Sequence, residues 1–247
     1  MFTPLHCIAL HTVRHSDTRS ILTAWSAELG RISIGMPDGK GREAARRRAL
    51  TMPLAMFEAV GDVRPGRDII SVRDLRPSAG SPASAPPTPA RTMLQLFLAD
   101  ALDRILRQSA PDPLLSDFIF DSLRRLARLS RPTALANFHI VFLFRMARFL
   151  GIAPDTDIPA GASPEKMIFD LREASFRPTL PAHTLFYAGA DAAAVRLVGR
   201  LTFDNMHLAR FTRDERSHIT DAIIDYYRLH LTPSGSIRSL DILKTLK

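Results

Sequence analysis

The 247-residue sequence predicts an α+β multidomain protein: an N-terminal five-stranded OB-fold β-barrel followed by an α-helical C-terminal domain. Short apolar runs alternate with turn residues up to about residue 77, and from Thr92 onward apolar residues recur at helical spacing. A segment rich in proline, serine and alanine separates the two patterns. With 46% apolar residues, the chain has enough hydrophobic side chains to fill real cores.

The predicted barrel spans residues 1–77. In its second apolar run, alternate residues share one face, as they do in a strand: Ile21, Thr23 and Trp25. The segments "RISIGM", "PLAMFEAV" and "DIISVRDL" continue this pattern, with one long basic loop before the fourth strand. Five strands in about seventy residues are typical of an OB-fold, whereas a β-sandwich usually has more strands.

Residues 78–91, "SAGSPASAPPTPAR", form the predicted connection between the domains. Proline, serine, alanine and glycine replace any apolar period there. Such a composition fits a flexible linker and also fits an ordered segment that runs over the surface. The sequence leaves both alternatives open.

The predicted helical domain covers residues 92–247. Its first helix has an apolar stripe, and the second begins at "DPLL", where Asp112 can cap the helix and Pro113 fits the first turn. A third helix, 134–150, is apolar nearly all round, which indicates a central position. Thr212 and Glu215 have the spacing of a capping box for a later helix. Residues 166–179 predict a small hairpin.

The chain carries a net charge of +8, which favours polyanionic partners such as nucleic acid or an anionic membrane surface. We expect no membrane segment, because the longest apolar stretch contains His139, Arg145 and Arg148. The N-terminus has no pattern of a secretory signal. Cys7 is the only cysteine, which excludes an internal disulfide and zinc sites built on several thiolates. These features predict a cytoplasmic protein without a cofactor.

The barrel's excess charge is concentrated in "KGREAARRR", residues 40–48. Residues 1–78 have a net charge of +4, and residues 40–48 alone also have +4. In OB-folds, strands and edge loops bind nucleic acid through cations and stacking aromatics. Trp25 is a stacking candidate, and ordinary packing in the core is the alternative. Arg14 and Arg19 are candidate cationic neighbours.

No catalytic motif appears in the sequence. "GMPDGKG" departs from a phosphate loop in its glycine spacing, and no Ser or Thr follows Lys40. His11 and His15 have no carboxylate or thiolate at ligand spacing. Paired acids, a nucleophile elbow and a dinucleotide fingerprint are also missing. We therefore expect that the protein is not an enzyme.

The helical domain carries a second group of arginines. Arg124, Arg125 and Arg128 share the polar face of the second predicted helix, where pairing with nearby acids and with the helix dipole would explain them. Arg145 and Arg148 interrupt an otherwise apolar helix and need a partner or an opening to solvent. An apolar groove with arginines at its mouth would suit an acidic peptide.

Several segments in register resemble the bacterial recombination mediator family RecO over nearly the entire chain. They are "IALHTVRHSDTRSILTAWSAELGRISI", "ANFHIVFLFRMARFLGIAPD", "FDLREASF", "LTFDN" and "YYRLHL" with "IRSLDILKTL". The resemblance implies an OB-fold and a helical domain that bind single- and double-stranded DNA and anneal complementary strands without chemical catalysis. It also implies partnership with RecR and with the acidic C-terminal tail of the single-strand-binding protein SSB. RecA, and RecF as a further candidate, would be indirect partners.

The resemblance also implies candidate site residues. The family's basic barrel loop falls on five positions: Lys40, Arg42, Arg46, Arg47 and Arg48. The SSB-tail groove would lie in the helical domain, with candidates inferred from pattern: Arg124, Arg125, Arg128, Phe142, Arg145 and Phe149. Many relatives carry a four-cysteine zinc site in that domain, but no cysteine follows Cys7 here, so we predict no zinc. A different hypothesis is an adaptor that binds an acidic tail without binding DNA.

Overall fold

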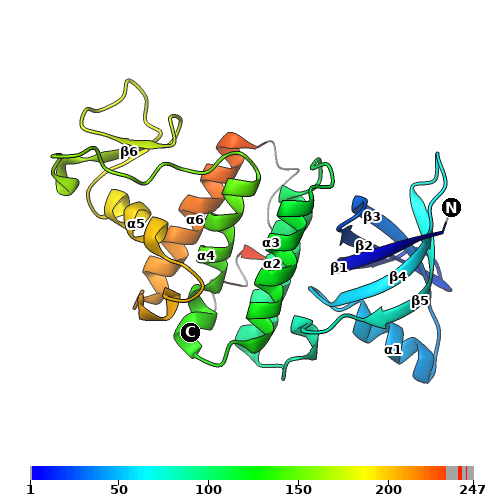
Figure 1. Cartoon of the computed structure of the whole chain (residues 1–247). Helices are drawn as coiled ribbons and strands as arrows, with labels where there is room; N and C mark the ends of the chain where they lie inside the picture. Colours follow the sequence, from blue (N-terminus) through cyan, green and yellow to red (C-terminus); the bar gives the residue numbers. More distant parts are fainter. Residues whose placement is uncertain (1, 232–238, 241–242, 244–247) are drawn as a thin grey trace. The chain divides into compact units, whose positions relative to one another are not determined.

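The computed structural model describes residues 2–231, 239–240 and 243. These residues fall into two compact units (Figure 1). The first holds residues 2–129 together with the described residues after 238, and the second holds residues 130–231. Much of "IRSLDILKTL" lies outside the described residues.

The N-terminal strands form a closed barrel in the order β1-β2-β3-β5-β4, which confirms the OB-fold prediction. The strands are β1 (Phe2–Arg14), β2 (Arg19–Ser26), β3 (Gly30–Pro37), β4 (Met56–Asp62) and β5 (Ile69–Pro77). Only β3 and β5 pair in parallel, and β1 closes the barrel against β4. Leu22, Ile34 and Phe57 are among the side chains that fill its core.

The segment between β3 and β4 is a helix, so the prediction of a long basic loop there is wrong. Helix α1 spans Arg42–Leu50 and buries Ala44 and Leu50, the latter against the barrel core. Alanine, arginine and glutamate are strong helix formers, and the nine-residue segment contains little else. Figure 1 shows α1 at the barrel beside β5.

The predicted connection, residues 78–91, lies inside the first unit and is ordered. It contains a short 3₁₀ helix, η1 (Pro82–Ser84), with Pro82 buried. The hydroxyl of Ser81 is also buried and accepts a hydrogen bond of 2.9 Å from the backbone N–H of Met56. The surface-wrapped alternative therefore describes this segment better than a flexible linker. The division between the compact units falls later, at residues 129–130.

Two capped helices complete the first unit. In α2 (Pro89–Ile105), Thr88 caps the N-terminus, and in α3 (Pro113–Arg128), Asp112 accepts hydrogen bonds from two backbone N–H groups, as predicted. At the other end of α3, the buried Arg91 donates to the carbonyls of Leu126 and Leu129 over 2.8 and 2.7 Å. Arg91 therefore holds α2 and α3 together.

The second unit is built from three helices, α4 (Pro132–Phe149), α5 (Gly189–Arg200) and α6 (Arg213–His230). A small sheet of β6 (Ile168–Asp170), β7 (Ser175–Arg177) and β8 (Phe186–Tyr187) accompanies them, with short turns η2 (Pro164–Lys166) and η3 (Met206–Leu208). The antiparallel β6–β7 pair confirms the predicted hairpin. The capping box at α6 is also confirmed.

Helix α4 is the central helix of this unit, as its all-round apolar pattern predicted. His139 on α4 lies 2.9 Å from the hydroxyl of Thr220 on α6, and Tyr227 donates to the carbonyl of Leu143 over 2.8 Å. Asn137 donates to the carbonyls of Met206 and Ala209. These bonds pair buried polar groups of neighbouring elements.

Candidate nucleic-acid interface

Helix α1 presents its arginines to solvent because its other face is used for packing. Ala44 and Leu50 are buried, whereas Arg42, Arg46 and Arg48 are exposed, as is Lys40 immediately before the helix. A helix with one small apolar face and long cationic side chains elsewhere displays charge without losing its attachment to the barrel. The structure thus keeps the predicted basic residues together.

Few carboxylates neutralise this cationic group. Arg47 lies 3.7 Å from Glu43 one turn earlier, and Arg48 donates to the carbonyl of Gly39 over 3.4 Å. Within the described residues, Arg42 and Arg46 form no ion pair with an acid. Exposed arginines without a carboxylate partner attract phosphate groups.

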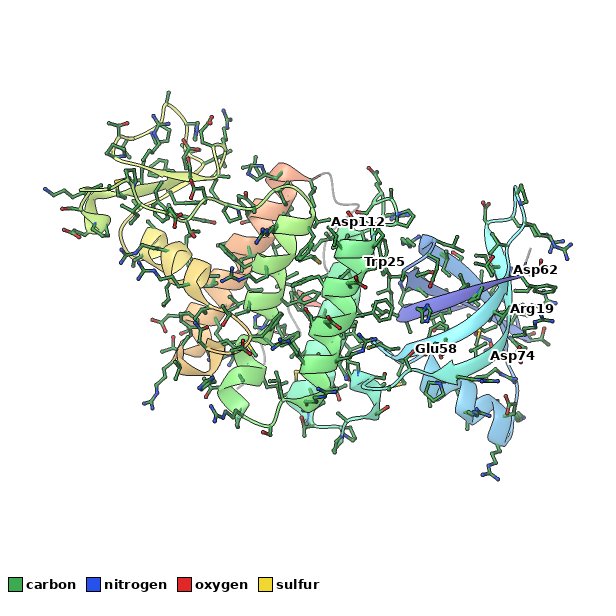
Figure 2. All side chains as sticks on the ribbon, viewed as in Figure 1. Arg19, Trp25, Glu58, Asp62, Asp74 and Asp112 are labelled. Atoms are coloured by element: carbon green, nitrogen blue, oxygen red, sulfur yellow. The ribbon has the colours of Figure 1, made fainter. Side chains whose placement is uncertain are left out.

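Arg14 and Arg19 lie near the β1–β2 hairpin turn. Arg14 pairs with Asp17 at 2.9 Å, which offsets its charge. Arg19 is exposed and faces Pro37 in the β2–β3 register, three residues before Lys40. Figure 2 shows Arg19 at the end of the barrel away from Trp25. Arg19 is therefore the nearer extension of the cationic group on α1.

Trp25 does not face solvent, so its assignment as a stacking residue is wrong. Its side chain is 0% exposed, and its indole N–H donates to the Ser116 hydroxyl on α3 over 3.3 Å. Its register partner Arg31 pairs with Asp103 on α2. Helices α2 and α3 thus cover the outer barrel face at this position, as the labelled Trp25 in Figure 2 shows. The apolar residues on the outer face of β1 and β2 were the sequence signal that could have indicated this cover.

The six candidates for an acidic-peptide groove do not gather within one unit. Arg124, Arg125 and Arg128 are exposed on α3 in the first unit, and the other three belong to α4 in the second. Phe142 is fully buried, so its assignment to an open groove is corrected: it packs in a stacked pair with Phe138. Phe149 is partly exposed.

Arg145 has the partner that its place in an apolar helix required. Its guanidinium donates to the carbonyl of Gly199 over 3.0 Å, and to the carbonyl of Leu201 over 3.0 Å from Nε and 2.5 Å from Nη2. Burial and the charge of Arg148 lower the pKa of Arg145 below its ordinary value. The side chain therefore joins α4 to the end of α5, and Arg148 is exposed.

The described residues contain no cluster of three or more His, Cys, Asp or Glu side chains able to hold a metal. Cys7 lies in the barrel core, where burial raises the pKa of its thiol. Among the same residues, no helix is both long and apolar enough to span a membrane.

Comparison with known proteins gives a consistent result. The family model "Recombination protein O C terminal" matches residues 87–240. DNA repair protein RecO of Phocaeicola vulgatus is 34% identical over 239 residues, covering 97% of this chain and 96% of that protein. The protein of the same name from Porphyromonas gingivalis is also 34% identical with the same coverage, and that of Bacteroides fragilis is 31% identical. The chain belongs to the RecO family.

Proposed function

We propose that this protein is a non-enzymatic recombination mediator that binds single- and double-stranded DNA and anneals complementary strands. The observation that carries the proposal is the exposed group on and before α1, in which Lys40, Arg42 and Arg46 form no ion pair within the described part of the chain. Membership of the RecO family supports the same activity.

Annealing brings two polyanions together, so a protein that promotes it must reduce their repulsion. Arginines that bind phosphate do this and leave base edges free to pair. Phosphate contact carries no sequence information, which suits a protein that acts on any gap. The buried Trp25 supports binding led by charge more than by aromatic stacking.

We also propose that RecR and the acidic SSB tail are partners and that RecA loading is the outcome, with RecF as a further indirect partner. The exposed α3 residues Arg124, Arg125 and Arg128 remain the candidates for an acidic peptide. Arg124 already pairs with Asp121 at 2.7 Å, so this surface is partly neutralised. We propose that neither metal nor cofactor takes part and that the protein acts in the cytoplasm.

The experiment compares annealing by the wild type and by an Arg42→Gln/Arg46→Gln/Arg48→Gln variant on naked and SSB-coated oligonucleotides. Glutamine keeps helix propensity and removes the charge. We expect loss of annealing on both substrates. The slope of log affinity against log salt concentration for single-stranded DNA should become less negative by about 2, taking roughly 0.7 per lost contact.

The matched control is Arg172→Gln/Arg200→Gln/Arg210→Gln, which removes the same charge from exposed positions of the second unit. Its annealing should equal that of the wild type. Normal annealing by the α1 variant would instead mean that the basic helix is only a solvated surface and that the exposed α3 arginines are the leading DNA surface. A wild type that anneals neither substrate would favour the adaptor hypothesis.

A further inference from the structure

A groove of about 630 Å³ lies between β1 and α2 in the first unit. Its walls include three apolar side chains, Val13, Pro53 and Leu96, and two of these are unusually open to solvent, with Val13 56% and Leu96 39% exposed. Its volume is in the range of sites that hold small organic molecules, roughly 300–1,000 Å³. The exposed apolar surface is therefore shaped into a concave site.

The polar side of the groove consists of groups that are already neutralised. Asp103 accepts a hydrogen bond from Arg31 over 2.7 Å, and its second oxygen lies 3.5 Å from His11 Nδ1. Asp100 pairs with Arg104 at 3.2 Å through one oxygen, and its other oxygen accepts hydrogen bonds from the backbone N–H and the hydroxyl of Ser239, which also lines the groove. Because each carboxylate has a cation beside it, the groove does not strongly repel an anion, and the Asp103 oxygens retain capacity to accept a further hydrogen bond.

The groove continues into the cationic surface of α1. A smaller adjoining cavity, about 40 Å³, shares Thr12 and Thr51 with the groove and is lined by Arg47 and Arg48. Arg47 Nε is buried and makes no hydrogen bond with any described residue. The Arg47 side chain as a whole is 27% exposed, and a guanidinium is a good partner for a phosphate oxygen.

We propose that this groove receives unstacked bases of a single DNA strand whose phosphates lie on Arg47 and Arg48. The apolar walls would cover the faces of the few bases that lie in the groove, while His11 and Asp103 meet their edges, and the other bases of the strand would stay free to pair. Base contact of this kind complements the electrostatic attraction of the backbone, as in other proteins that bind single strands. The inference rests on the proposed DNA binding and adds a site that distinguishes single strands from duplexes.

A duplex cannot use the groove without breaking base pairs and unstacking them, which costs a few kcal/mol. The groove would therefore add affinity only for single strands. Asp103 would favour bases with an exocyclic amino group, because carboxylates accept hydrogen bonds from such groups. Cytosine, adenine and guanine, which have such a group, should bind better than thymine, which has none.

The first test is a Val13→Ser/Leu96→Ser variant, which removes the apolar walls from exposed positions and keeps every charge. We expect single-strand affinity to fall about 5- to 30-fold, which corresponds to a loss of roughly 1–2 kcal/mol of binding free energy. Duplex affinity and the salt slope should stay at wild-type values. A Leu114→Ser/Leu208→Ser control removes two leucines that are each 69% exposed and should bind normally.

The second test uses Val13→Cys, which adds an accessible thiol to a chain whose natural cysteine is buried. Saturating single-stranded oligonucleotide should slow maleimide labelling at position 13, duplex should not, and Leu114→Cys should label equally in all conditions. The proposal would be overturned if single strands and duplexes protected position 13 equally. It would also be overturned if neither DNA form protected position 13 and the double-serine variant bound single strands with wild-type affinity. Neither result would alter the α1 charge test, whereas a wild type that binds no DNA would overturn the proposed function itself.

Discussion

Arg31 on β3 donates a hydrogen bond from Nε to Asp103 on α2 over 2.7 Å, which joins the barrel to the first helix after it. Asp103 is buried, and His11 on β1 approaches its other oxygen. One carboxylate thus holds two strands against one helix. The barrel, α2 and α3 consequently form one compact unit, although 78–91 has the composition of a linker.

Breaking this pair should destabilise the first unit. We expect Arg31→Met to lower the free energy of unfolding by about 2–3 kcal/mol, less than the 3–5 kcal/mol of a fully buried pair because the Arg31 side chain is 24% exposed. A double-mutant cycle with Asp103→Asn should give a coupling energy of about 1–2 kcal/mol. Urea denaturation followed by Trp25 fluorescence reports on this unit.

The control for that cycle is the exposed pair Arg14 and Asp17, for which Arg14→Met should cost less than about 0.5 kcal/mol. If Arg31→Met were equally mild, solvent rather than Asp103 would be the main partner of its guanidinium.

Much of the architecture could be predicted because local signals and the fold agreed. Alternation predicted the strands, and Asp112, Thr212 and Glu215 mark helix starts in the sequence as they do in the structure. Helix α1 was missed because its four arginines dominate the segment. They obscured the two positions, Ala44 and Leu50, that are buried. Its strong helix formers were a local signal for a helix, but the barrel core against which Leu50 packs is not contained in the local pattern.

The sequence was enough to predict the concentration of charge at the candidate site, but not the spatial arrangement of its residues. Residues 40–48 stand out in composition, and the structure keeps them together on one surface. The burial of Trp25 depends on Ser116, 91 residues later, and Phe142 is buried and stacks on Phe138 of its own helix. The groove beside β1 likewise needs α2, so sequence spacing alone could not reveal it.

Trp25 gives a direct optical test of how DNA is bound. Because it is the only tryptophan and is fully buried, native emission should be blue-shifted and resistant to soluble quenchers. Addition of saturating single-stranded DNA should leave this emission unchanged, whereas unfolding should shift it to the red. Strong quenching by DNA would mean that the indole becomes available for stacking, contrary to its place beneath α3.

Asp170 organises the small sheet of the second unit. Its carboxylate accepts hydrogen bonds from the backbone N–H groups of Arg172 and Glu173 and from Arg177, and it lies 3.4 Å from His183. Asp170→Asn should lower the free energy of unfolding by about 2–3 kcal/mol, since it weakens several bonds to a charged acceptor. All three tyrosines lie in this unit, so tyrosine emission follows its unfolding.

The Asp170 carboxylate should also make the stability of the second unit depend on pH in the acid range. Burial would raise the pKa of Asp170, but the N–H groups of Glu173 and Arg172 and the Arg177 guanidinium together lower it below its ordinary value. A lowered folded pKa stabilises the native state above the unfolded pKa, near 3.9, and that stabilisation is lost as the pH falls through the folded pKa. The control Glu165→Gln, at an exposed position, should leave this dependence unchanged.

His139 should cause a second loss of stability on acidification, which begins at a higher pH than that of Asp170. Complete burial, with a smaller contribution from Arg216, lowers the pKa of His139 to about 3. The Thr220 hydroxyl donates its proton to the carbonyl of Arg216, so His139 Nε2 must be the donor in the 2.9 Å contact between the two side chains. The native state therefore contains the neutral imidazole with its proton on Nε2.

The sign of the effect follows from which state binds the proton. Below about pH 6.5 the unfolded chain protonates this histidine while the native state does not, so protonation favours unfolding. The stabilisation is complete above pH 6.5 and should fall by up to about 1.4 kcal/mol per pH unit between 6.5 and the native pKa. The comparison is with His139→Gln, whose amide can donate from the Nε2 position without titrating. The stability difference between wild type and variant, measured by denaturation with tyrosine emission at pH 8, 6.5 and 5, should stay constant to 6.5 and then shrink; a constant difference at pH 5 would mean that water reaches His139 and that its charged form is tolerated in the native state.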